Sequence, residues 1–84
     1  MNNDIKQKID AATFRRLINF LQKNTELQNI DLMNLAGFCR NCLSKWMVEE
    51  GKKVNIDISY DDARKSVYGM DYEEWKKKFQ KPIE

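Results

Sequence analysis

The stretch that decides the fold covers residues 31–51, with the sequence DLMNLAGFCRNCLSKWMVEEG. Its apolar side chains recur at spacings of three and four, which is the pattern of one buried helical face. They are Leu32, Leu35, Cys39, Leu43, Trp46 and Met47. This spacing predicts one long central helix whose apolar side encloses the cysteines. Gly51, which two lysines follow, is expected to end that helix.

The segment before it, residues 4–24, predicts a first helix with Asp4 as its N-cap. At about 100° per residue, its apolar side chains spread over roughly 220° of the circumference, whereas a surface helix needs a stripe little wider than 100°. A chain of 84 residues has few elements to cover both sides of such a helix. We therefore expect a second copy of the chain to cover part of it.

The segment after the central helix alternates between aliphatic and polar residues over positions 54–58, like a strand. No second strand-like segment exists to pair with it, so we expect an extended connector whose aliphatic side chains lie over the helices. Ser59 then predicts the N-cap of a short helix that stops at Gly69.

The last predicted helix begins at Asp71 and ends before Pro82. Its Trp75 and Phe79 lie four residues apart and should face the core. The sequence therefore predicts one all-α domain over residues 1–84: a small bundle of about four helices around a long central helix, with an extended connector before the third helix.

Composition excludes several classes of protein. The net charge is +2, and the basic residues are scattered rather than concentrated on one segment, which argues against nucleic-acid binding. No segment approaches the roughly 18 apolar residues of a membrane span, and no signal-like apolar run follows the polar start. We expect a cytoplasmic protein, in which the two cysteines would be reduced.

Cys39 and Cys42 are the residues with the most obvious chemistry. A Cys-x-x-Cys pair is redox-active when it opens a helix, but here about two predicted helical turns precede Cys39. The favoured interpretation is therefore core packing. Two alternatives remain open: thiol redox chemistry, and a zinc site shared by two chains, since tetrahedral zinc needs four ligands and the chain has no histidine.

Small and polar residues occupy the opposite side of the predicted central helix: Asn34, Gly37, Asn41 and Ser44. They form either a solvated face or a close helix contact centred on Gly37. Arg40, at the edge of the apolar arc, either extends its guanidinium into water or binds an anion at an interface. We take Arg40, Asn41, Asn34 and Gly37 as a hypothetical partner or ligand groove.

The sequence contains no catalytic constellation, no cofactor motif and no metal-ligand set within one chain. The preferred prediction is a non-enzymatic, homodimerising interaction module with further surface for an unidentified protein partner. The alternative is a thiol-dependent redox or zinc-binding protein that uses Cys39 and Cys42.

Two runs also resemble a known family: NIDLMNLAGFCRNCLSKW at residues 29–46 and VYGMDYEEWKKKF at residues 67–79. Together they are similar to a family of short bacterial proteins known only as a domain of unknown function. The likeness extends from about Ala12 to Phe79 and implies an all-helical, dimeric, cytoplasmic protein. It implies no activity and no functional residue. Relatives often have proline where this chain has Asp71, and both suit a helix start.

Overall fold

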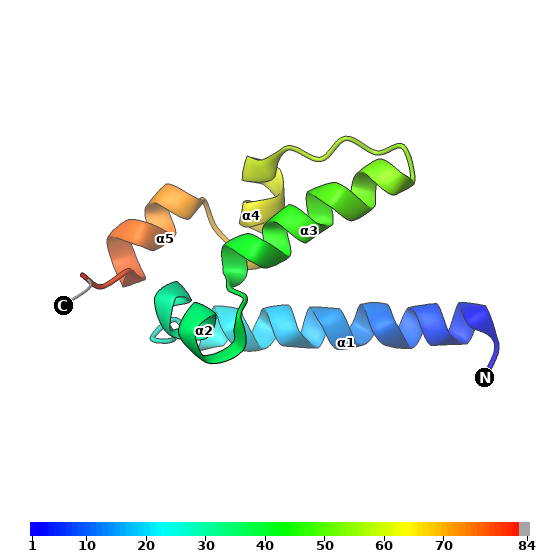
Figure 1. The fold of residues 1–84 in the computed structure, drawn as a ribbon, viewed down its shortest axis with the longest axis horizontal. Coiled ribbons are helices and arrows are strands. Elements are labelled where there is room, and N and C mark those ends of the chain that lie inside the picture. The colour runs from blue at the N-terminus through cyan, green and yellow to red at the C-terminus, as the bar shows by residue number, and fades with distance from the viewer. Residues whose placement is uncertain (83–84) are drawn as a thin grey trace.

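The computed structural model describes residues 1–82, in which it places five α-helices (Figure 1). They are α1 (Asn3–Lys23), α2 (Asn29–Ala36), α3 (Arg40–Lys53), α4 (Tyr60–Tyr68) and α5 (Tyr72–Phe79). The prediction of a small all-α fold is confirmed. None of the described helices combines the length and the apolar character that crossing a membrane would require.

The prediction of one continuous helix over residues 31–51 is wrong, because the chain breaks at Gly37 into α2 and α3. Gly37 has φ 78° and ends α2 in the left-handed conformation, with its N–H donating to the carbonyl of Met33 at 3.0 Å. Cys39 then adopts an extended conformation as the N-cap of α3. The apolar spacing runs on through two successive helices, so periodicity alone did not reveal the turn between them.

The end of α3 also differs from the prediction. The helix continues past Gly51 to Lys53, and the chain then folds back so that the N–H of Ile56 donates to the carbonyl of Gly51 at 2.9 Å. A Cβ at Gly51 would lie 2.9 Å from the oxygen of Ile56, so this close approach requires glycine. The extended connector expected over residues 54–58 forms only in part: residues 54–55 make a turn, with Asn55 at φ 64°, and residues 56–59 have no regular secondary structure. Of the three aliphatic side chains, Ile58 lies against Gly51 of α3, whereas Val54 and Ile56 are exposed.

The two C-terminal helices begin as predicted. The Ser59 hydroxyl accepts a hydrogen bond from the N–H of Asp62 at 3.0 Å and caps α4. Gly69, with φ 77°, ends that helix, and Asp71 is the N-cap residue of α5. Local capping signals therefore located both helices correctly.

The core lies where the C-terminal half of α1 meets α3, α4 and α5. Its buried members are Ile18, Leu21, Leu43, Val67, Tyr68 and Trp75. Trp75 faces this core as predicted, whereas Leu35 is 87% exposed and Trp46 is 50% exposed. The break at Gly37 explains Leu35, because α2 is no longer an extension of the α3 face and buries none of its residues.

The N-terminal part of α1 extends away from this core as a single helix (Figure 1). Its N-cap is Asn2 rather than Asp4: the Asn2 side-chain oxygen accepts from the N–H of Ile5 at 2.9 Å. Every side chain from residue 1 to residue 17 is exposed. We call residues 3–13 the arm, and residues 14–82 the body.

Candidate functional site

The first turn of α3 brings together most of the residues that the sequence singled out. Cys39 is the N-cap, and Arg40, Asn41 and Cys42 are the first three residues of the helix. Because the chain turns sharply at Gly37 just before them, these side chains point toward three different surroundings. Arg40 points into the protein, Asn41 lines a cleft, and Cys42 lies near the surface of α2.

Arg40 is buried, with only 1% of its surface exposed. One guanidinium nitrogen donates to the carbonyl of Leu27 at 2.6 Å and to the side-chain oxygen of Asn29 at 3.1 Å. The other donates to the carbonyls of Leu21 and Asn24 at 3.2 and 3.1 Å. The Leu21 carbonyl belongs to the last turn of α1, and those of Asn24 and Leu27 to the turn after it, near the negative end of the helix dipole. The Asn24 carbonyl also accepts from the N–H of Leu27 at 3.1 Å.

The guanidinium carbon also lies 4.8 Å from the ring centroid of Trp75, in a cation–π contact. Within residues 1–82 no carboxylate forms a salt bridge with Arg40, and burial lowers the pKa of this group. Carbonyl dipoles and the Trp75 ring therefore stabilise the charge in place of a counter-ion. Arg40 does not extend into water, and it joins α1, α3 and α5.

A hydrogen-bonded chain of polar side chains continues from Arg40. Asn29 accepts from Arg40 and donates through its amide nitrogen to the Tyr68 hydroxyl at 3.0 Å. The Tyr68 hydroxyl donates in turn to the side-chain oxygen of Asn41 at 2.7 Å. Burial raises the pKa of Tyr68, so the phenol stays protonated at neutral pH and can act as this donor.

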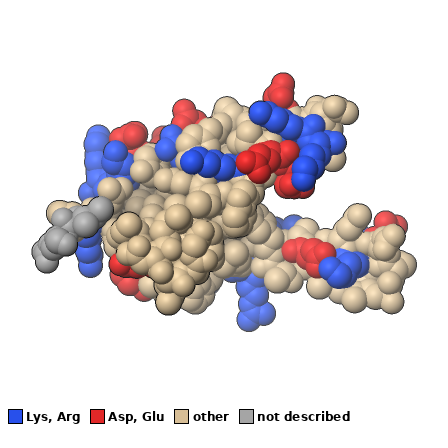
Figure 2. Space-filling model, in the orientation of Figure 1, with Lys and Arg blue, Asp and Glu red and all other residues tan. Residues whose placement is uncertain are grey.

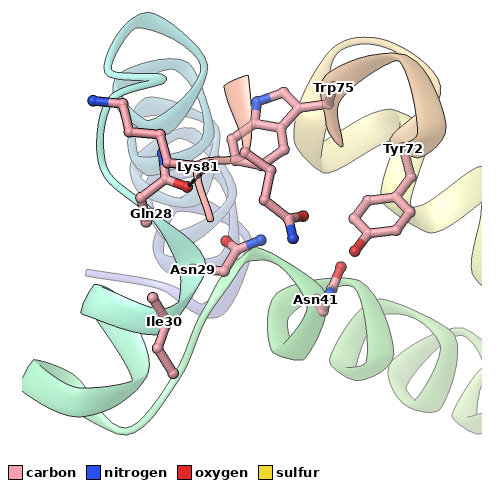
Figure 3. Close-up of a pocket in the computed structure, with 8 residues that line it drawn as sticks. Gln28, Asn29, Ile30, Asn41, Tyr72, Trp75 and Lys81 are labelled. Carbon is pink, nitrogen blue, oxygen red and sulfur yellow. Dashed lines mark hydrogen bonds between the residues drawn. The ribbon is translucent and has the colours of Figure 1, made fainter. Parts of the chain in front are cut away.

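A cleft of about 150 Å³ opens beside this chain of polar groups (Figure 3). Figure 3 shows Asn29 on one side of the space and Asn41 and the Tyr72 ring on the other, with Trp75 above them in this view. The lining residues are Gln28, Asn29, Ile30, Asn41, Tyr72, Trp75, Gln80 and Lys81. They supply amide, hydroxyl and ammonium groups but no carboxylate, thiol or imidazole, so the cleft can hydrogen-bond a small polar group.

The structure does not bring the four residues of the hypothetical groove to one surface. Asn41 lines the cleft, Arg40 is enclosed behind it, and Asn34 and Gly37 lie exposed at the end of α2. Ser44, from the same predicted seam, is fully buried and donates to the carbonyl of Arg40 at 2.9 Å. Gly37 makes no close helix contact, since nothing lies within 4 Å of a Cβ built there.

Gln28 is the cleft residue that sequence reasoning missed most clearly. Its side chain is buried and donates to the carbonyl of Phe79 at 3.0 Å, while its oxygen accepts from the N–H of Lys81 at 2.8 Å. These bonds fix the end of α5 beside the turn before α2. Their partners lie more than fifty positions away in the sequence, so no local pattern could indicate them.

The cysteines lie side by side at the start of α3, with their sulfur atoms 3.8 Å apart. Cys39 is buried and Cys42 is half-buried, and the Cys42 sulfur lies 3.7 Å from the sulfur of Met33. Burial raises the pKa of the Cys39 thiol, against the opposing effect of the backbone N–H groups of Cys42 and Asn41. Because α3 begins here, the expectation that two helical turns precede Cys39 is wrong.

Metal ligands are sparse around this pair. No group of three or more His, Cys, Asp or Glu side chains is placed to hold a metal ion anywhere in residues 1–82. Around the start of α3, the described part of the chain supplies only the thiols of Cys39 and Cys42 as metal ligands.

Comparison with known proteins places the chain in a family without assigning it an activity. No curated protein matches it. One family model matches residues 27–84, which include α2 to α5 and the whole Cys39–Cys42 segment. The chain therefore belongs to the family described as Protein of unknown function (DUF1244).

Proposed function

We propose that the protein is a homodimerising helical module in which α1 of one copy packs against α1 of a second copy. The contact surface is the outer stripe, which we define as Ile5, Ile9, Ala12 and Phe20. At about 100° per residue these side chains fall within roughly 80° of the helix circumference. Ile18 and Leu21, which α1 buries in its own body, lie on the other side.

The four residues of the outer stripe are apolar and open to solvent, while the basic side chains of Arg16 and Lys23 lie within the same arc of the helix. Ile5 is 49% exposed, Ile9 47% and Phe20 55%. A helix that packs on a core along one side normally carries polar residues on the other. Isolated helices are also only marginally stable in water, and most helical stability comes from packing. The arm therefore lacks, within one chain, the packing that would hold it in shape.

The main support for the proposal is the large solvent-exposed surface of the single chain. A folded monomer of 10.0 kDa exposes about 5,200 Å² by the usual size relation, whereas this chain exposes 6469 Å². Its radius of gyration is 14.1 Å, against about 12 Å for a compact chain of 84 residues. The excess of about 1,200 Å² exceeds the roughly 800 Å² that each partner buries in a standard interface.

Charge favours an antiparallel arrangement of the two α1 helices. Residues 14–23 carry Arg15, Arg16 and Lys23 and no acidic residue, whereas residues 3–13 carry two acidic and two basic side chains. Parallel helices would place the two basic halves side by side, and antiparallel helices place each basic half against a neutral one. With the two-fold axis beside Ala12, Ile5 faces the partner's Phe20.

The experiment is a measurement of molar mass by light scattering after size exclusion, at protein concentrations from about 10 to 500 µM. We expect the native chain to pass from about 10 to about 20 kDa over this range. The double variant Ile5→Lys/Ile9→Lys should stay monomeric, because two ammonium groups would have to be buried in the contact.

The matched control is Gln7→Lys, which adds one positive charge to the same helix on the side away from the outer stripe. It should dimerise like the native chain. A native chain that remains monomeric at the highest concentration would overturn the proposal, and so would a double variant that still dimerises.

A further inference from the structure

The thiols at the start of α3 have a property that dimerisation does not use. Their sulfurs lie 3.8 Å apart, at the N-cap and the third residue of a helix of 14 residues. We propose that Cys39 and Cys42 form a reversible dithiol–disulfide site that exchanges with low-molecular-weight disulfides. In this exchange Cys42 reacts first and Cys39 completes the reaction.

The geometry allows the bond to form with little movement. A disulfide requires about 2.05 Å between the sulfurs, so they must approach by less than about 2 Å. Rotation of the side chains can provide this, since Cys39 lies outside the helix with φ −146° and ψ −177°. The break at Gly37 creates this arrangement, because a continuous helix would hold Cys39 in helical backbone.

In the first turn of α3, the backbone N–H groups of Asn41 and Cys42 face the Cys39 sulfur and oppose the effect of burial on the pKa of that thiol. The opening N–H groups of a helix lack intrahelical partners and carry a partial positive charge, which stabilises a nearby anion. The first turn of α3 contains no acidic residue that would oppose this effect. A cysteine at such a helix start is the usual setting of a reactive thiol.

Burial gives the two thiols different roles. Cys39 exposes 7% of its surface, so a dissolved oxidant reaches it poorly, and the same burial raises the pKa of its thiol. Cys42 is half-buried, and its sulfur lies beside Met33 on the exposed edge of α2. A small disulfide can therefore reach Cys42 and not Cys39. In a usual Cys-x-x-Cys redox motif the first cysteine is exposed and reacts first. Here the second cysteine, Cys42, is the more exposed one and is expected to react first.

The exchange balances without any further reactant. The Cys42 thiolate attacks one sulfur of the small disulfide RSSR, forming a mixed disulfide and releasing one thiolate. Cys39 then loses its proton and attacks the Cys42 sulfur, which forms the Cys39–Cys42 bond and releases the second thiolate. The two protons from the cysteines convert the released thiolates to two RSH molecules. The protein is oxidised by two electrons and RSSR is reduced.

The test uses the full-length chain in buffers of oxidised and reduced glutathione, quenched with maleimide and analysed by intact mass. We expect a species about 2 Da lighter than the dithiol, with no maleimide and no glutathione attached. Reduced glutathione should restore the dithiol. A chain that stays reduced, keeps a bound glutathione or forms disulfides between copies would overturn the proposal.

The order of reaction is tested on the native sequence with limiting maleimide and peptide mapping, which needs no mutation. We expect Cys42 to be labelled at least about ten times faster than Cys39, and equal labelling of the two in urea. Faster labelling of Cys39 would overturn the assignment. As a second measurement, Cys39→Ser should accumulate the glutathione mixed disulfide, whereas Cys42→Ser should not.

This site and the proposed dimer fail independently. The outer stripe lies on α1, and the cysteines lie at the junction of α2 and α3. The same glutathione titration on Ile5→Lys/Ile9→Lys should give the same disulfide, whatever its state of association.

Discussion

Arg40 exposes 1% of its surface in the body, whereas Ile9 exposes 47% of its surface in the arm. Side-chain chemistry alone would predict the opposite arrangement. Arg40 can be buried because four carbonyl or amide oxygens accept its hydrogen bonds and Trp75 covers its face. Ile9 is exposed because no element within residues 1–82 covers it.

The arm and the body therefore differ in whether their side chains find packing partners within one chain. In the body, polar groups and apolar side chains find partners within the chain, across α1, α3, α4 and α5. The outer stripe, which runs from the arm to Phe20, has no such partner within residues 1–82. Figure 2 shows the arm as a separate projection, with an open notch between it and the C-terminal half of α3. A groove of about 280 Å³ also lies between α1 and α3, lined by Phe14, Leu43, Trp46, Met47 and Glu50.

The strongest test of this comparison is Arg40→Ala. The substitution leaves the carbonyls of Leu21, Asn24 and Leu27 without their buried donor and removes the contact with Trp75. We expect the free energy of unfolding to fall by about 3–5 kcal/mol, which a small domain can barely tolerate. Urea denaturation followed by circular dichroism measures it.

Arg15→Ala is the matched control, since it removes an exposed guanidinium from α1. It should change stability by less than about 0.5 kcal/mol. A similar small loss for Arg40→Ala would mean that the carbonyls find water instead, and that the body does not depend on this residue.

A smaller effect is expected from Gly37→Ala, which tests the break that gives the body its shape. The space around Gly37 is open, so the cost comes from a Cβ at φ 78°. We expect a loss of about 1–2 kcal/mol in urea denaturation. Gly37→Asn should lose less, because asparagine tolerates the left-handed conformation. No loss with alanine would favour the continuous helix over residues 31–51.

The outcome at Gly37 shows how far local sequence signals reach. Ser59 and Gly69 bounded α4 correctly because a cap and a left-handed stop act within a few residues. Gly37 carried the same stop signal, but the apolar spacing on both sides of it favoured one helix. Two helices joined by a short turn can keep that spacing, so periodicity was the weaker criterion here.

The surroundings of Arg40 could not be predicted in this way. Its acceptors are 11 to 19 positions away in the sequence, and only the packing of α1, α3 and α5 around α4 brings them within reach. The cleft has the same character: Asn41 was singled out, but Gln28 and Tyr72 join it from other elements. In contrast, the apolar width of α1 was visible in its residue order, and the structure leaves that face open.

The smallest effect on the body should come from Ile5→Lys/Ile9→Lys, because neither side chain packs on it. We expect the free energy of unfolding of the monomer to change by less than about 0.5 kcal/mol.

The arm should respond differently, since a short helix without packing is marginal in water. In hydrogen exchange, amides of residues 6–13 in this variant should approach unfolded-chain rates, while those of α3 and α4 keep their protection. In the native chain at dimer-forming concentrations, both regions should be protected. Arm amides that stay equally protected in the monomeric variant would show that α1 holds itself together, and the contrast between the two regions would then be one of shape alone.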